Sequence, residues 1–198
     1  MTLPRLTTFL TALMTLGVAL ATGLGSAIHA TGGIGAFGGF ESGPWQAPLA
    51  VSAEDGNPYV EVALARRGTL PMGPAEGLLL IAETDSAGRL LDAACAYRLE
   101  GRMPVSRAFT LAAYRPDGAL LSAFGRPSAL SGSGLVYGRS GAFLIDAAPE
   151  PRAGNWLALS GAGRFVFVAR VYDTGLAATL HMSQPPALPE IRRVAGSC

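Results

Sequence analysis

Short apolar segments alternate with turn sequences from residue 77 onward, and this pattern restricts the fold more than any other feature of the chain. Segments such as GLLLIAET, SRAFTLAAY and RFVFVARVYD are rich in strand-favouring residues, and DSAG and RPDG are turn sequences between such segments. These signals recur roughly every 8 to 15 residues, with no helical segment between them. The pattern predicts an all-β domain built as an antiparallel sandwich or barrel.

The strand predicted over residues 164–173 is apolar on both faces. Because successive side chains of a strand point to opposite faces, such a strand is expected at the centre of a sheet. Arg170 shares one face with valines, and a cation in apolar surroundings needs a partner. We expect Glu76 or Asp146 to supply it as a structural ion pair, with contact to a ligand as the alternative.

One short helix is predicted ahead of these strands, over residues 57–67. Asn57 is a suitable N-cap, Pro58 fits the first turn, and Gly68 ends the segment. The apolar side chains of this segment fall on one face, so we expect the helix to pack on the sheet.

The N-terminal segment is apolar from Leu6 to Ala30. As a helix it would be about 37 Å long, enough to cross a hydrocarbon core of roughly 30 Å. Arg5 and the amino terminus precede it and Glu41 follows, so the positive-inside rule places the N-terminus in the cytoplasm and the rest of the chain in the periplasm. We predict a single-pass protein of the bacterial inner membrane. A cleaved signal peptide ending near Ala27 is the alternative.

Three regions follow from these features: an anchor or signal sequence over 1–30, a Gly-rich juxtamembrane linker over 31–56, and the β-sandwich domain over 57–198. The linker contains GIGAFG, which matches the dinucleotide-binding pattern but lacks the strand before it and the helix after it that this function requires. Within the anchor, Gly17, Ala21 and Gly25 recur at four-residue spacing, which would allow two such helices to pack closely as a homodimer.

The charge pattern argues against nucleic-acid binding. The chain contains Arg but no Lys, which we attribute to codon bias, and from Glu41 onward acidic and basic residues balance. A phosphate backbone is bound by clustered basic residues, and no such cluster is present.

Cys95 and Cys198 are the two cysteines of the chain, and His29 and His181 are its two histidines. This set does not make a zinc site, and no metal or other cofactor is predicted. In an exported domain the two cysteines would form a disulfide that fastens the C-terminus to the sheet. Two free buried thiols are the alternative.

The usual patterns of catalysis are missing from the sequence. It contains no G-x-S-x-G, and His181 is the one histidine of the exported part that could act as a base. The SGSG sequence at 131–134 is interpreted as a hairpin loop. Whether the protein is an enzyme stays open, but binding fits the sequence better than catalysis.

Four segments together resemble a known bacterial family: GLLLIAETDSAGRLLDAACAYRL, AFTLAAYRPDGALLSA, GNWLALSGAGRFVFVARVYD and ALPEI. Their order and spacing are similar to those of the domain of unknown function 1214, and the resemblance extends from Asn57 to Cys198. It implies a jelly-roll-like β-sandwich without an assigned reaction. Larger relatives carry a companion domain, numbered 1254, which the anchor replaces here.

The chain departs from the family pattern at Ala108-Phe109, where a Phe-Trp pair is usual, and where prolines are replaced in NWLAL and RVYDT. A pocket lined by those positions in relatives would be altered here. The residues that match the motif are Tyr97, Phe109, Tyr114, Asn155, Trp156, Arg170 and Tyr172. Structural roles in the sandwich are the alternative to binding for all of them.

We therefore predict a membrane-anchored, periplasm-facing β-sandwich that acts as a binding or envelope-assembly module for an unidentified ligand. The alternatives are a hydrolase or lyase that acts on an envelope-derived substrate, using Arg170, Tyr172 and a nearby acid, and a structural envelope protein without a ligand. The candidate ligand-binding residues are Glu76, Arg107, Tyr114, Asn155, Trp156, Arg170 and Tyr172.

Overall fold

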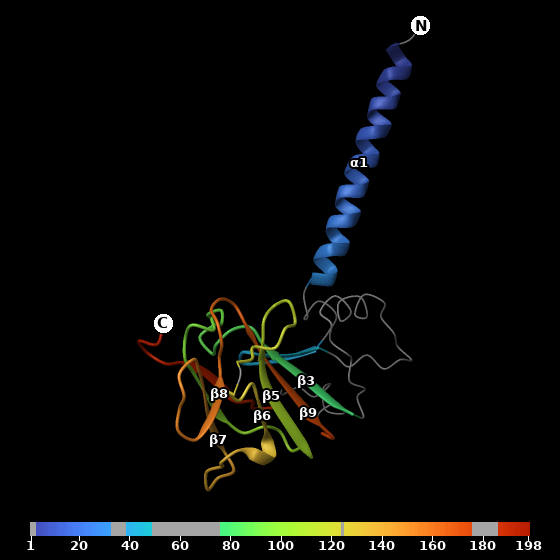
Figure 1. The fold of residues 1–198 in the computed structure, drawn as a ribbon. Helices are drawn as coiled ribbons and strands as arrows, with labels where there is room; N and C mark the ends of the chain where they lie inside the picture. The colour runs from blue at the N-terminus through green and yellow to red at the C-terminus, as the bar shows by residue number, and fades with distance from the viewer. Residues whose placement is uncertain (1–2, 33–38, 49–75, 124, 176–185) are drawn as a thin grey trace.

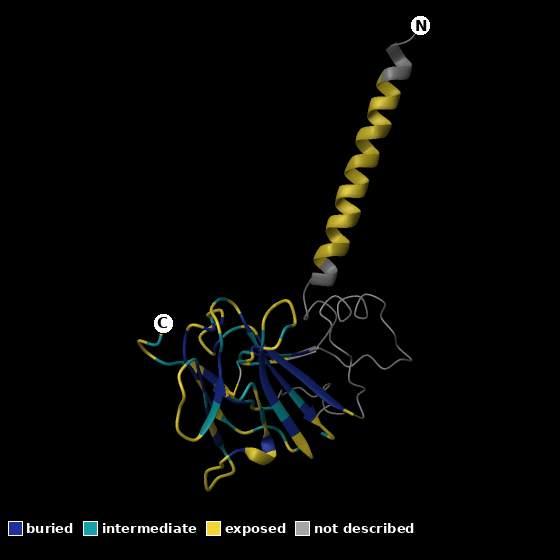
Figure 2. Ribbon diagram, in the orientation of Figure 1, coloured by how far each residue is buried: buried dark blue, intermediate teal, exposed yellow. Residues whose placement is uncertain are grey.

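The computed structural model describes residues 3–32, 39–48, 76–123, 125–175 and 186–198, which form one long helix and two β-sheets (Figure 1). The helix, α1 (Leu3–Gly32), is exposed at every side chain from Thr7 to His29 (Figure 2). The stretch Thr7–His29 has a mean hydropathy of 1.6. The predicted apolar helix is therefore confirmed, and it is long and apolar enough to span a membrane.

Threonine hydroxyls within α1 are satisfied by the helix itself. Thr11 donates to the carbonyl oxygen of Thr7 at 3.0 Å, and Thr22 donates to that of Val18 at 2.8 Å. Thr15 bonds Thr11 in the same way. Hydrocarbon contains no water to bond such hydroxyl groups, so threonines in a membrane-spanning helix need partners within the protein, and these internal bonds supply them.

The strands form a sheet of six, in the order β1-β2-β3-β9-β5-β6, and a sheet of four, in the order β10-β4-β7-β8. The strands of the first sheet are β1 (Gly39–Ser42), β2 (Trp45–Pro48), β3 (Gly77–Ala82), β9 (Val166–Tyr172), β5 (Ala108–Tyr114) and β6 (Ala129–Ser131). Those of the second are β10 (Glu190–Arg193), β4 (Tyr97–Gly101), β7 (Phe143–Ala148) and β8 (Asn155–Ala158). Neither sheet closes, and the domain is an all-β sandwich, as predicted.

Strand β9 lies between β3 and β5, in the central position predicted from its two apolar faces. One strand pair differs from the antiparallel prediction: β7 and β8 run parallel, with Ile145 opposite Asn155. A connection as short as residues 149–154 is unusual between parallel strands. It contains two prolines and ends in Gly154, whose φ of +83° permits a sharp reversal of the backbone before β8.

A single apolar core lies between the two sheets and draws on both. On β4, Tyr97 and Leu99 are buried while Arg98 is exposed, as alternation predicts. The Tyr97 ring packs edge-on against Phe165 and Phe167, with centroid distances of 5.7 and 6.3 Å. These contacts join β4 of the small sheet to β9 and the residue before it in the large one.

The two turn sequences adopt the backbone that their glycines were expected to provide. Gly88 of DSAG has a φ of +77° and Gly118 of RPDG a φ of +84°, a region that other residues rarely occupy. The SGSG segment forms a short 3-10 turn over Gly132–Gly134, directly after β6.

Residues 39–48 differ from the sequence expectation. We assigned them to the linker over 31–56, but they form the β1–β2 hairpin, and Trp45 of β2 pairs with Ala82 of β3. Trp45 is only 1% exposed and belongs to the core. The linker prediction relied on the glycine content of the segment, and glycine content does not indicate that one aromatic residue, Trp45, is buried. The helix predicted over 57–67 and the GIGAFG sequence lie outside the described residues.

The C-terminus is fastened to the small sheet, as predicted. The sulfur atoms of Cys95 and Cys198 lie 2.05 Å apart, the distance of a disulfide bond. The backbone N–H of Val194 and the hydroxyl of Ser197 both bond the carbonyl oxygen of Ala96. Residues 194–198 therefore lie along the small sheet, directly after its edge strand β10.

Candidate functional site

The six-stranded sheet carries a second, smaller apolar cluster on the face turned away from the sandwich core. Leu79 and Ile81 of β3 and Val168 of β9 form it, each less than a tenth exposed. Tyr114 and Val166 pack against it. Strand alternation produces this cluster, because the residues between these positions point into the core.

A pocket of about 330 Å³ opens over this cluster, at the end of the sheet where β3 and β5 end and β9 begins. Its size lies in the range of about 300 to 1,000 Å³ that is usual for small-molecule sites. The strands contribute Ile81, Tyr114, Val166, Val168 and Arg170 to its lining. The segments beside the strands add Glu83, Leu90, Leu91, Arg115, Pro116, Gly118, Arg164 and Phe165.

Arg170 and Tyr114 are polar residues of the pocket lining that contact each other. Nη1 of Arg170 donates to the Tyr114 hydroxyl at 3.2 Å, and its Cζ lies 5.6 Å from the centroid of the same ring. Neither of the two carboxylates expected to pair with Arg170 does so among the described residues. Asp146 pairs instead with Arg98 at 3.0 Å, on the other sheet, and the backbone of Glu76 bonds Asp173 at the opposite end of the large sheet. The described residues thus give Arg170 an uncharged partner, and no carboxylate among them neutralises its positive charge.

Three further charged residues surround the pocket. Arg115 pairs with Asp117 at 3.4 Å, and both side chains are more than half exposed. The backbone N–H of Ala119, together with the Arg115 guanidinium, holds the pKa of Asp117 below its ordinary value. Glu83 and Arg164 are also exposed, and their side chains make no hydrogen bond or ion pair to any residue that the structure describes.

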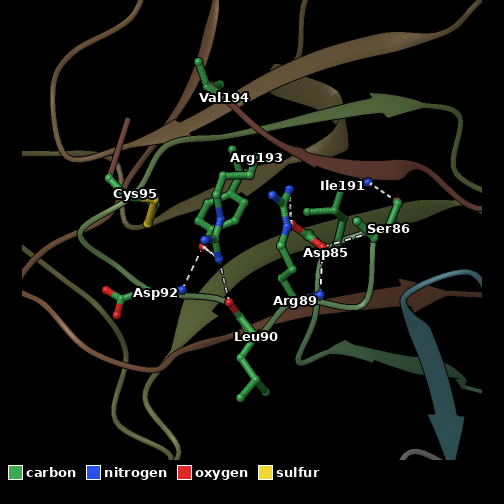
Figure 3. Close-up of polar contacts among 12 residues, drawn as sticks. Asp85, Ser86, Arg89, Leu90, Asp92, Cys95, Ile191, Arg193 and Val194 are labelled. Atoms are coloured by element: carbon green, nitrogen blue, oxygen red, sulfur yellow. Dashed lines mark hydrogen bonds and ion pairs between the residues drawn. A yellow bond between two sulfur atoms is a disulfide. The ribbon is translucent and has the colours of Figure 1, made fainter. Parts of the chain in front are cut away.

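The loop that brings Glu83 and Leu90 to the pocket is braced by the buried carboxylate of Asp85 (Figure 3). One carboxylate oxygen accepts the backbone N–H groups of Ala87 and Arg89 at 3.0 Å, and the other accepts Nε of Arg89 at 2.8 Å. Burial raises the pKa of Asp85, but these hydrogen bonds and the nearby Arg89 charge outweigh it, and the pKa lies below its ordinary value. The loop is thus held by a carboxylate that is ionised at neutral pH.

The C-terminal strand β10 also bonds this loop (Figure 3). Ser86 and Ile191 exchange two hydrogen bonds, at 2.8 and 2.9 Å. Arg193 donates from Nη2 to the carbonyl oxygen of Leu90 at 2.8 Å and to the Tyr97 hydroxyl at 3.2 Å. Its guanidinium also lies over the Tyr97 ring, 5.5 Å from the centroid. The position of Leu90 in the pocket therefore depends on β10.

The structure places three of the candidate residues at the opposite end of the sheet. Glu76 precedes β3, Tyr172 ends β9, and Arg107 donates its backbone N–H to the Tyr172 carbonyl oxygen. The Arg107 side chain pairs with Asp173 at 3.3 Å, and both groups are largely exposed. None of the three lines the pocket.

Asn155 and Trp156 lie in the small sheet and bind backbone. The Asn155 side chain accepts the N–H of Val136 at 2.7 Å and donates to the carbonyl oxygens of Val136 and Leu144. Trp156 donates from Nε1 to the carbonyl oxygen of Ala148 at 3.0 Å. Of the seven candidates, the pocket brings together only Tyr114 and Arg170.

Glu83, Arg115 and Arg164 line the pocket, but none of them is among the seven candidate ligand-binding residues. Each stands close to one end of a strand, beside a turn or loop. The register of β3 and β5 on β9 brings these three strand ends to one edge of the sheet. The predicted central position of β9 was the one available signal for these residues. Antiparallel strands on both sides of a central strand end where that strand begins.

The pocket can bind an anion or an apolar group, but it lacks the usual parts of nucleophilic catalysis. Its described lining contains no Ser, Thr, Cys or His, and Glu83 is its one carboxylate. Among the residues that the structure describes, no group of three or more His, Cys, Asp and Glu is placed to hold a metal ion.

A family model described as a protein of unknown function, DUF1214, matches residues 76–175. That range contains strands β3 to β9 and the whole described lining of the pocket. No protein among those with curated descriptions matches the chain.

Solved structures of uncharacterised bacterial proteins also match. The VPA0106 protein from Vibrio parahaemolyticus aligns with a TM-score of 0.61 at 16% identity, over 87% of this chain and 43% of its own. A putative uncharacterised protein from Burkholderia cenocepacia aligns with a TM-score of 0.41 at 20% identity, over 60% of this chain and 29% of its own. The first likeness shows a shared fold. The chain spans less than half the length of either protein.

Proposed function

The chain belongs to the DUF1214 family of proteins of unknown function, and from that premise we propose that it is a membrane-anchored binding module whose β-sandwich holds a small ligand. The observation that carries the proposal is the pocket itself. It combines an apolar floor of Ile81 and Val168 with Arg170, whose charge no described carboxylate neutralises. Binding sites for small molecules have this composition, mostly apolar with a few convergent polar groups.

The proposed location is the periplasmic side of the bacterial inner membrane, with α1 as a single-pass anchor. Arg5 precedes the apolar stretch and no other Arg or Lys occurs before Glu41, so the positive-inside rule favours a cytoplasmic N-terminus. The cysteine pair at disulfide distance supports the same location, because such bonds persist in oxidising compartments.

A hydrolase or lyase is the second candidate. The observation that favours it is the presence of Glu83 and Tyr114, both able to take part in proton transfer, in one pocket with Arg170. The pocket offers no nucleophile with a neighbouring base among its described residues. Binding therefore explains the described lining with fewer assumptions.

Ligand binding is tested by a thermal-shift screen of the full-length protein in lipid nanodiscs against periplasmic glycans, lipids and small acids. Val166→Trp would fill the pocket, whereas Val136→Trp changes an exposed residue outside it. We expect a ligand that raises the Tm of the wild type and of Val136→Trp but not of Val166→Trp. Equal ligand-induced shifts of Tm in the two variants, or no shift of Tm with any compound class, would refute the proposal.

The proposed location is tested by treating spheroplasts with a protease. Cleavage of the β-sandwich in intact spheroplasts, together with retention of α1 in the membrane after alkaline extraction, is the expected result. A domain that is protected until the membrane is lysed would place it in the cytoplasm instead.

A further inference from the structure

We propose that the ligand of this pocket is a monocarboxylate with an apolar body. The inference rests on the proposed binding function and adds the chemical class of the ligand. Three properties of the described lining support it: the guanidinium of Arg170, which no described carboxylate neutralises, the balance of charge among the lining residues, and the apolar floor of Ile81 and Val168.

The guanidinium of Arg170 is arranged to receive a carboxylate. Nη1 is used by the hydroxyl of Tyr114, and no other group that the structure describes accepts a hydrogen bond from this guanidinium. The remaining N–H groups are not sealed in the protein, since Arg170 is not among the buried, unsatisfied polar side chains. A planar guanidinium offers paired donors that match the two oxygens of a carboxylate.

The charged side chains of the pocket lining favour an anionic ligand over a cationic one. Arginines outnumber carboxylates in the described lining, with Arg115, Arg164 and Arg170 against Glu83. Asp117 offsets Arg115, which leaves a small positive excess. A single negative charge balances that excess, whereas a bound cation would add to it.

The apolar floor of the pocket favours a ligand with an apolar body. Val168 and Ile81 are almost fully buried beneath the pocket, and Val166 and Tyr114 continue the same surface. Leu90, at the rim, is 46% exposed, so a hydrocarbon group in the pocket would cover apolar surface that water now contacts. Each buried methylene contributes about 0.8 kcal/mol, so a small acid without a hydrocarbon part would lose most of this gain.

The test measures binding of four probes to the full-length protein in nanodiscs by calorimetry: octanoate, acetate, 1-octanol and octyltrimethylammonium. Octanoate has both the charge and the chain, and each of the others lacks one or reverses the charge. We expect octanoate to bind at least about tenfold more tightly than any of the other three, since a charge-assisted hydrogen-bonded pair is worth about 1.5 to 3 kcal/mol.

Two substitutions locate the charge. Arg170→Gln is expected to weaken octanoate binding about 10- to 100-fold and to leave 1-octanol unaffected. Arg98→Gln is the matched control, since Arg98 is an exposed arginine on the small sheet, paired with Asp146. Should Arg170→Gln fail to fold, Arg164→Gln removes an exposed charge of the lining and is expected to weaken octanoate binding about twofold to fivefold.

The outcomes separate the two proposals. If 1-octanol or octyltrimethylammonium binds as tightly as octanoate, or if a folded Arg170→Gln variant binds octanoate normally, the ligand class is wrong and the binding function stands. Acetate binding as tightly as octanoate would likewise refute the apolar body. If no probe binds and the wider screen also yields nothing, the binding function itself fails.

Discussion

The indole Nε1 of Trp45 donates a hydrogen bond of 2.7 Å to the carbonyl oxygen of Pro189, across 144 positions of the sequence. Trp45 belongs to the β1–β2 hairpin at the edge of the large sheet, and Pro189 immediately precedes β10 of the small sheet. Ser42 of the same hairpin bonds the carbonyl oxygen of Pro186. The first and last strands of the domain are thus joined to each other across the two sheets.

We expect Trp45→Phe to lower the free energy of unfolding by about 1 to 3 kcal/mol, because it removes a buried donor and leaves the Pro189 carbonyl group without it. Urea unfolding of the full-length protein in detergent micelles measures the change. Trp156→Phe is the matched control and should cost less, because the Ala148 carbonyl oxygen keeps a second donor, the N–H of Leu159. Equal losses in the two variants would show that the Trp45 bond contributes nothing specific.

Reducing the Cys95–Cys198 disulfide is expected to lower the free energy of unfolding by about 2 to 5 kcal/mol. The bond joins residues 103 apart, and constraining a loop of that length removes much of the conformational freedom of the unfolded chain. Unfolding with and without dithiothreitol measures the effect. The Cys95→Ser/Cys198→Ser double variant should be as unstable as the reduced protein and insensitive to the reductant. A reductant effect that persists in the double variant would contradict this account.

The sequence predicted those features of the fold that follow from local patterns. The two apolar faces of residues 164–173 indicated a central strand, and β9 lies between β3 and β5. The glycines of DSAG and RPDG indicated turns, and both have positive φ. In each case the signal lies within one short segment of the sequence, so the feature can be predicted without knowing which distant segments pair.

Features that depend on pairing between distant segments could not be predicted. Trp45 stands among glycines and polar residues, and only its pairing with β3 makes it a core residue. Glu83 and Arg164 enter the pocket because β3 and β9 pair in one register, and a shift of one residue would place Ile81 and Val168 on opposite faces of the sheet. Tyr114 was identified in advance because it lies within a strand pattern that could be assigned to a face.

Acid should remove the contribution of Asp85 to stability. Its pKa is lowered from an ordinary value of 3.8, so the carboxylate stabilises the folded protein fully above about pH 5, and this contribution is lost as the pH falls through the lowered value. We expect Asp85→Asn to be about 1 to 3 kcal/mol less stable than wild type at pH 7, and the difference to narrow below pH 3.8. Urea unfolding at a series of pH values measures it.

Asp117→Asn is the matched control for this effect, since Asp117 also has a lowered pKa but is exposed to solvent. Its difference from wild type should be smaller at every pH, because water competes for the same hydrogen bonds. An Asp85→Asn deficit that stays constant between pH 6 and pH 3 would show that the loss arises from packing rather than from the charge.

Gly132 is required by the close approach of Phe109. A Cβ atom at residue 132 would lie 2.6 Å from Cε1 of the Phe109 ring, which is buried and packs on Phe143 with a centroid distance of 5.7 Å. Because the ring cannot move without disturbing that contact, Gly132→Ala should lower the free energy of unfolding by about 1 to 3 kcal/mol. Gly134→Ala, two residues along the same turn, meets no atom within 4 Å and should change stability by less than about 0.5 kcal/mol. Thermal unfolding of the two variants side by side decides the matter, and equal stability would mean that the turn shifts to accommodate the methyl group.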